Sequence, residues 1–332
     1  MYRCRLLLII FFMVGCKEEK HPVEAAFYYW KTNFTLTGPE KQILEELDVN
    51  KLYVRYFDIA MKNNTPVPVM PVFFESKPPV KEIVPVVYIK NEVMLNERAD
   101  LPQLAAHVVD YIRQINRENN ITTREIQLDC DWTLNSKDRF LAFVNLLAEK
   151  TKDTLSATIR LHQAKYHNRT GIPKVHKGVL MYYNMGTIAA DSLNSIYDRN
   201  IAKRYLPSLK NYPLQLNVAV PLYAWMIHSR QNKILRLLSR IRLKDMEAQK
   251  AFKKIDDSRF IVLQSGNYFG HYFKKDDEVK IESISEKDLK EMVADLRKSL
   301  KQPPGEIIFY DLDSTNINAY EKTMFKKLVN SF

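Results

Sequence analysis

Carboxylate side chains stand where several apolar runs of this sequence end. They are Asp58, Asp129, Asp131 and Asp311. Alternate residues of a strand share a face, so Asp129 and Asp131 point the same way, into an interior. Because two close carboxylates repel, we expect a raised pKa for one of them or a basic partner, for which Arg160 is a candidate. A pair across a cleft, such as Asp131 with Asp311, could hydrolyse a glycosidic bond, whereas a structural role would use these aspartates to bind loop amides.

Aromatic side chains follow other apolar runs, where they could stack on a ligand. They are Trp132, Tyr183, Tyr223 and Trp225, and Asn184 follows Tyr183 directly. Flat rings suit the C–H faces of pyranose sugars, although aromatic residues at strand ends also cap hydrophobic cores. We predict substrate contacts for Asp58, Trp132, Arg160, Tyr223 and Trp225.

Metal and cofactor chemistry finds little support in the sequence. His162, His167 and His176 have irregular spacing, which does not predict a metal site. Cys130 lies between the two aspartates and points away from them, as a buried and inert thiol would. The chain has eight glycines and no glycine-rich phosphate loop. We therefore expect no metal and no cofactor.

The elements that must position these side chains alternate between short apolar strands and amphipathic helices. The predicted strands are residues 25–32, 51–58, 83–89, 125–131, 155–161, 178–184, 214–222 and 305–311. Helices are predicted near residues 38–47, 101–119, 136–150, 195–209 and 317–329, with Thr37 as an N-cap. Eight strands interleaved with helices are typical of an α/β protein with a single (β/α)8 barrel, whose chemistry sits at the carboxyl ends of the strands.

Two segments depart from a minimal barrel. Residues 63–79 are rich in proline, which predicts an extended loop over the barrel mouth. Residues 223–300 are too long for one crossover, and we interpret them as an insertion between strands seven and eight. It is predicted to contain a basic helix at 232–254, a hairpin at 260–284 and a final helix at 285–300. The barrel domain as a whole is assigned to residues 25–332.

Two of these strand ends carry motifs of a known family. Leu128-Asp129-Cys130-Asp131-Trp132-Thr133 resembles the D-x-D-x-E strand of glycoside hydrolase family 18, the chitinase group, and Met181-Tyr182-Tyr183-Asn184 resembles its M-x-Y-[DN] strand. The resemblance implies a barrel that acts on glycans containing N-acetylhexosamine. It also implies that Asp131, Tyr183 and Asn184 orient the acetamido group of the sugar. Asp129 and Asp311 complete the predicted catalytic set.

The departure from the motif concerns the proton donor. The glutamate that ends D-x-D-x-E is Thr133 here. A threonine hydroxyl cannot act as a general acid near neutral pH, because its pKa is far too high. Another carboxylate would have to supply the proton, the candidates being Asp58, Glu75, Asp311 and Asp313; otherwise the barrel binds without hydrolysis.

The N-terminus has the pattern of a bacterial lipoprotein signal. A short cationic start precedes a nine-residue apolar run, 6–14, and Gly15-Cys16 follows. The run is shorter than the roughly 20 apolar residues that span a bilayer and fits a secretory signal. We predict a signal peptide at 1–15, lipid on Cys16, a tether at 16–24 and membrane attachment in the bacterial envelope at the outer membrane. Lys17-Glu18-Glu19 resembles the export signal of surface-exposed Bacteroidetes lipoproteins.

Charge and cysteine use are consistent with this location. Removal of residues 1–15 takes away Arg3 and Arg5, which lowers the formal charge from +11 to +9. In the absence of a nucleic-acid motif we interpret the excess as a solvated basic face and expect no nucleic-acid partner. With Cys4 removed and Cys16 acylated, Cys130 has no disulfide partner within the chain.

Three functions remain open at this point. The chain could be a membrane-anchored glycosidase-like enzyme, a non-catalytic lipoprotein that binds a glycan or peptidoglycan, or an envelope interaction protein that uses the 223–300 insertion. The predicted partners are a glycan and, through the lipid, a membrane. The sequence does not predict an oligomeric state.

Overall fold

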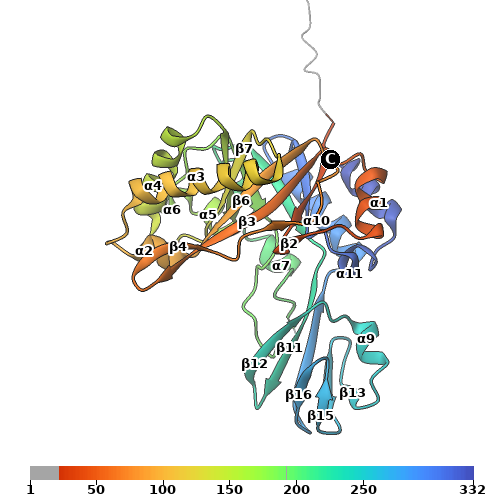
Figure 1. Ribbon diagram of the computed structural model, residues 1–332. Coiled ribbons are helices and arrows are strands. Elements are labelled where there is room, and N and C mark those ends of the chain that lie inside the picture. Colours follow the sequence, from red (N-terminus) through yellow and green to blue (C-terminus); the bar gives the residue numbers. More distant parts are fainter. Residues whose placement is uncertain (1–21, 192) are drawn as a thin grey trace, which may run out of the picture.

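The computed structural model describes residues 22–191 and 193–332 (Figure 1). The predicted signal peptide, Cys16 and residues 17–21 of the tether lie outside the described residues. Among the residues that are described, no helix is long and apolar enough to cross a membrane.

Eight parallel strands form a closed barrel, which confirms the (β/α)8 prediction. They are β1 Glu24–Tyr29, β3 Lys51–Lys62, β6 Glu82–Ile89, β7 Glu125–Asp129, β8 Thr154–Arg160, β9 Lys177–Met181, β10 Leu216–Pro221 and β18 Glu306–Tyr310. Each strand pairs in parallel with the next, and β1 pairs with both β3 and β18 to close the ring. The strands are almost wholly buried because side chains fill the barrel and helices cover it outside.

The longer helices follow the predicted apolar spacing. They are α1 Gly38–Glu46, α3 Leu101–Asn119, α4 Lys137–Lys150, α10 Glu286–Ser299 and α12 Lys322–Val329. Thr37 caps α1 in a reciprocal capping box with Glu40, as its side chain predicted. In α3, Leu104, Val108, Ile112 and Ile115 share the buried face.

Shorter helices occupy the remaining connections. They are α2 Asn91–Leu95, α5 Leu161–Lys165, α6 His167–Thr170, α7 Arg199–Ala202, α8 Leu206–Leu209, α9 Leu243–Glu247 and α11 Ser314–Ile317. The helix predicted at 195–209 is therefore wrong as one element. Pro207 lies at the start of α8, where proline is tolerated, but it cannot continue a helix from the preceding turn. The C-terminal helix predicted at 317–329 is likewise divided into α11 and α12.

The proline-rich segment is a β-ribbon, not the loop that we predicted. Strand β4, Thr65–Val69, pairs antiparallel with the end of β3. Strand β5, Phe73–Phe74, pairs with β2, Asn33–Phe34. Because β4 is an edge strand, Pro66 and Pro68 do not interrupt a ladder on its outer side.

The segment after β10 folds as a separate small sheet on the barrel. Its strands are β12 Lys233–Ser239, β11 Ala224–Arg230, β17 Glu278–Ser283, β14 Arg259–Val262 and β13 Phe252–Lys254 in spatial order, with a two-stranded ribbon of β15 Gly266–Tyr268 and β16 His271–Phe273. Figure 1 shows this sheet projecting from one end of the barrel. The inserted sheet ends at Ser283, since α10 packs against α8 and α12 of the barrel. We call residues 224–283 the insertion.

The basic helix predicted at 232–254 is wrong. Residues 233–239 form β12, in which exposure alternates along the strand with a period of two. Gln231 and Asn232 form the two-residue turn with φ angles of 49° and 62°, the backbone that a tight hairpin requires. Neither residue is glycine, so the usual sequence signal for such a turn was missing.

Candidate ligand site at the barrel mouth

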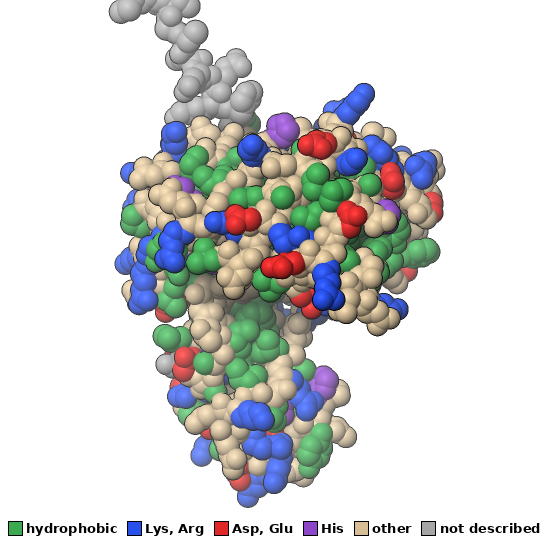
Figure 2. Space-filling model, turned by 90° about the vertical axis from the view of Figure 1, so that its left-hand side faces the viewer, with side chains coloured by type: hydrophobic (Ala, Val, Ile, Leu, Met, Phe, Trp, Pro, Cys, Tyr) green, Lys and Arg blue, Asp and Glu red, His purple; other side chains and the backbone are tan. Residues whose placement is uncertain are grey.

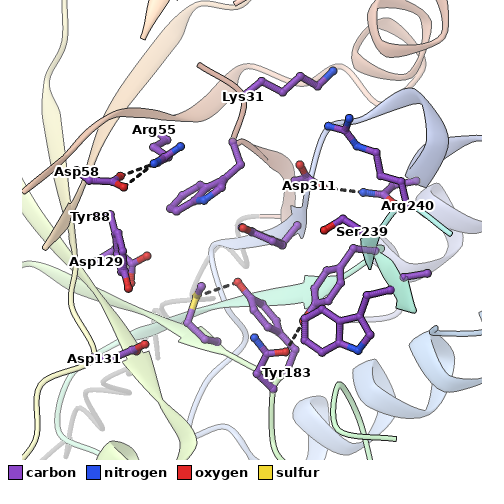
Figure 3. Close-up of a pocket in the computed structure, with 18 of the residues that line it drawn as sticks. Lys31, Arg55, Asp58, Tyr88, Asp129, Asp131, Tyr183, Ser239, Arg240 and Asp311 are labelled. Carbon is purple, nitrogen blue, oxygen red and sulfur yellow. Dashed lines mark hydrogen bonds and ion pairs between the residues drawn. The ribbon is translucent and has the colours of Figure 1, made fainter. Parts of the chain in front are cut away.

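One cavity of about 690 Å³ lies where the carboxyl ends of the barrel strands meet the insertion (Figure 3). The predicted site residues that line it are Asp58, Asp129, Asp131, Arg160, Tyr183, Asn184, Tyr223, Trp225 and Asp311. The lining also includes groups that our prediction missed, above all Trp30, Arg55, Arg240 and Tyr310. In Figure 3, Asp129 and Asp131 lie on one side of the cavity, with Asp311 and Arg240 on the other.

Trp132 does not belong to this lining, so its predicted ligand contact is wrong. The indole is 1% exposed, stacks on Phe140 and donates a hydrogen bond to the carbonyl of Thr170 over 2.8 Å. The chain turns away from the barrel axis directly after Asp131. Thr133 therefore also lies outside the lining, where its backbone N–H donates to Ser136 Oγ over 2.9 Å.

The two aspartates of the motif have different environments. Asp129 is 6% exposed and accepts a hydrogen bond of 2.7 Å from Thr158 Oγ1. Burial raises the pKa of Asp129 to about 6, against the opposing charge of Arg160. Asp131 forms a two-point ion pair with Arg160, in which Nη2 lies 2.7 Å from Oδ2. Both predicted consequences, a raised pKa and a basic partner, are confirmed.

Asp58 is paired in the same manner with Arg55, which we did not predict. The guanidinium donates to both carboxylate oxygens over 2.7 Å and 2.5 Å. Strict strand alternation would place residues three apart on opposite faces. A register shift between Arg55 and Phe57 interrupts that alternation and brings the two side chains together.

Asp311 is a half-buried carboxyl on the opposite side of the cavity. Burial and the nearby charge of Asp313 raise the pKa of Asp311 to about 6. Asn316 Nδ2 donates to Asp311 Oδ1 over 2.6 Å and holds the carboxyl in place. Asp313 does not line the cavity and forms ion pairs with Lys31 and Arg240 at 3.4 Å and 3.0 Å. Glu75 also lies outside the lining, where it accepts from Asn33.

Aromatic rings from four barrel strand ends and from the insertion form one continuous surface along the cavity. Tyr310 has ring-centroid distances of 5.4 Å to Trp30, 5.4 Å to Tyr183 and 5.7 Å to Tyr223. Trp225 extends this surface from the insertion, 5.3 Å from Tyr223. The hydroxyl of Tyr223 also donates to Asn184 Oδ1. Trp30 directly follows β1, and Tyr310 is the last residue of β18. Both could have been predicted in the same way as Tyr183, from an aromatic residue at the end of an apolar run.

Metal-binding side chains do not converge anywhere in the described ranges 22–191 and 193–332, where no three His, Cys, Asp or Glu residues are arranged to hold an ion. Cys130 is 1% exposed, and burial raises the pKa of its thiol. This environment favours the inert protonated form that we predicted.

No family model and no curated protein matches this sequence. Among solved structures, a chitinase-like agglutinin from Robinia pseudoacacia has a TM-score of 0.50 at 11% identity, covering 92% of this chain and 98% of that one. The two chains share a barrel fold. A xylanase and α-amylase inhibitor protein from Scadoxus multiflorus has a TM-score of 0.48 at 9% identity, covering 92% and 97% of the two chains. A GH113 β-1,4-mannanase has a TM-score of 0.43 at 9% identity, covering 94% of this chain and 100% of that one.

Proposed function

We propose that the protein binds a glycan at the barrel mouth, between the strand ends and the insertion. The observation that carries this proposal is the aromatic surface formed by Trp30, Tyr310, Tyr223 and Trp225 beside buried carboxylates in one open cavity. Rings of this kind stack on the apolar faces of sugars, and paired Asp and Arg groups fix hydroxyl groups. The barrel shared with a chitinase-like agglutinin is compatible with this role.

We favour a glycan that contains N-acetylhexosamine. The support comes from the family 18 resemblance of Asp131, Tyr183 and Asn184, all of which line the cavity. Titration calorimetry with chitin oligosaccharides, and with cello-oligosaccharides as the control, tests the preference. A glycan array without any binding would remove the proposal for the whole site.

Hydrolysis is a second candidate function, favoured by one observation. Asp311 lines the cavity, and its pKa of about 6 leaves part of the carboxyl protonated near neutral pH. It could therefore donate a proton to the glycosidic oxygen, the step that Thr133 cannot perform. Water would attack the anomeric carbon as its bond to the glycosidic oxygen breaks; the leaving sugar keeps the proton from Asp311, and the water loses a proton to Asp129, across the cavity. Release of reducing sugar by the wild type, and its loss in Asp311→Asn, is the test.

We also propose that lipid on Cys16 anchors the chain in the bacterial envelope. The support is the charged start, the short apolar run and the cysteine that follows it. Metabolic labelling with an alkyne fatty acid should mark the wild type and leave Cys16→Ser unlabelled. Protease treatment of intact cells would then show whether the anchored chain faces outward.

A further inference from the structure

The chain enters the barrel at the end opposite to the mouth. The backbone N–H of Glu24 donates to the carbonyl of Gly305 over 2.9 Å, and Glu24 is in register with Glu306, the first residue of β18. The cavity, in contrast, is lined by residues at the other ends of the strands, such as Asp129 and Tyr310. Figure 1 accordingly shows the start of the described chain and the insertion at opposite ends of the molecule.

The entry end carries exposed cations on loops from six of the barrel connections. They are Lys81, Arg124, Lys152, Lys174, Lys210 and Lys301. Exposed acids at the same end are Glu24 at the start of β1, Asp48 and Glu75 on loops, and Glu46, Glu118 and Glu149 in the last turns of α1, α3 and α4. Lys81 and Arg124 lie beside the chain entry, where they line one surface hollow together with Glu24. Figure 2 shows Lys and Arg side chains around this end.

Two structural roles account for other cations at this end. Lys51 lies 2.6 Å from Glu306, and Lys177 lies 2.9 Å from Glu125, so these two neutralise carboxylates inside the barrel. Cations in the last turn of a helix offset the helix dipole, as Lys150 does in α4. Lys81 and Arg124 directly precede strands β6 and β7, and neither role applies to them.

We infer that this end of the barrel is a membrane-facing surface that binds anionic phospholipid headgroups and turns the mouth away from the bilayer. Five residues separate Cys16 from Pro22, so the distance between them is at most roughly 20 Å in a fully extended chain. Lysine and arginine side chains are attracted to anionic lipid within a Debye length, about 10 Å at 0.1 M salt. A lipid chain and a cationic patch together hold a protein more firmly than either alone.

The insertion is also rich in cations. Lipid binding by the entry end must therefore be distinguished from a general effect of the net positive charge. Lys253, Lys274 and Lys275 are exposed on the insertion. The insertion, and with it β13 and β16, lies at the end of the molecule away from the chain entry (Figure 1). Reversing these three changes the net charge as much as reversing Lys81, Arg124 and Lys152. The two triple variants are therefore matched controls.

The experiment uses a chain that begins at Lys17 and keeps every residue of the barrel and insertion, so that attraction is measured without the lipid. Sedimentation with phosphatidylcholine vesicles is compared with sedimentation with vesicles that also contain phosphatidylglycerol, at low and high salt. We expect binding to the anionic vesicles only, weakened by salt. The variant Lys81→Glu/Arg124→Glu/Lys152→Glu should bind at least about tenfold more weakly. The insertion variant should stay within about twofold of the wild type.

Three results would overturn the inference. They are no binding of the wild type to anionic vesicles at low salt, an equal loss in both variants, or unchanged binding of the barrel-end variant. Thermal unfolding of each variant checks the fold. If a reversal variant unfolds, the corresponding glutamine variants carry the same comparison with half the charge change. The inference rests on the proposed lipid anchor at Cys16, but the experiment measures neither lipidation nor glycan binding, so its failure is distinguishable from a failure of either proposal.

Discussion

The indole N–H of Trp225 donates a hydrogen bond to Glu282 Oε2 over 2.7 Å, from one strand of the insertion to the next. Glu282 is 2% exposed and also accepts from Ser195 Oγ, on the loop that follows β9. Lys280 Nζ lies 2.7 Å from the other carboxylate oxygen. One buried carboxylate therefore joins the insertion to a barrel loop and fixes the ring that faces the cavity.

Removal of the Trp225 ring should weaken glycan binding. Stacking on an aromatic face contributes about 1 kcal/mol or more, so Trp225→Ala should lower the affinity roughly tenfold. Trp225→Phe keeps an aromatic face and loses the hydrogen bond to Glu282. Its affinity for the glycan should therefore lie between those of the wild type and Trp225→Ala. Titration calorimetry measures all three, and equal affinities would show that Trp225 does not contact the ligand.

The Glu282–Lys280 pair should matter for stability, because both side chains are buried. Lys280→Met leaves the carboxylate without its cation and should lower the free energy of unfolding by about 3 kcal/mol. The double variant Lys280→Met/Glu282→Gln removes both charges and should recover most of that loss. Urea unfolding measures both variants. A double variant as unstable as the single one would show that packing, not charge, holds this contact.

The raised pKa of Asp129 predicts a pH dependence of stability. The folded pKa of about 6 exceeds the ordinary value near 4, so the folded state binds the proton more tightly than the unfolded chain. The stability contributed by Asp129 is therefore present below about pH 4 and is lost as the pH rises to about 6. The side chain of Asp129→Asn stays neutral at every pH. The free energy of unfolding of this variant should therefore exceed that of the wild type by roughly 3 kcal/mol at about pH 7 and by little at about pH 4. Urea titrations at the two pH values measure this, and a gain independent of pH would contradict the assignment.

Much of the framework could be predicted because the strand and helix periods are regular. Asp129, Asp131 and Asp311 were predicted from their positions at the ends of apolar runs, and in the structure they line one cavity. Arg55 was not predicted, because its position beside Asp58 depends on a register shift that the sequence does not indicate. Trp132 was misplaced because the chain leaves the barrel axis one residue before it, and only its buried contact with Phe140 reveals this.

The insertion was harder to predict, for a different reason. Its strands are short, and the apolar residues of 233–239 are compatible with either period. The hairpin turn at Gln231 and Asn232 lacks glycine. Trp225 was found as an aromatic residue near a strand end, whereas Glu282 could not be found, since its role depends on strand pairing within the insertion.

Restoring a glutamate at position 133 should not create a glycosidase. Thr133 holds the family position of the proton donor in sequence, yet it lies outside the cavity lining, and its backbone is bonded to Ser136 at the start of α4. A general acid must come within hydrogen-bond reach of the glycosidic oxygen, so a carboxyl on this loop cannot protonate a ligand in the cavity without a rearrangement. Release of chromophore from aryl N-acetylglucosaminides by Thr133→Glu should equal that of the wild type. A clear gain would show that the loop after Asp131 turns inward when a glycan binds, with Asp311→Asn as the comparison that shows whether the original site still contributes.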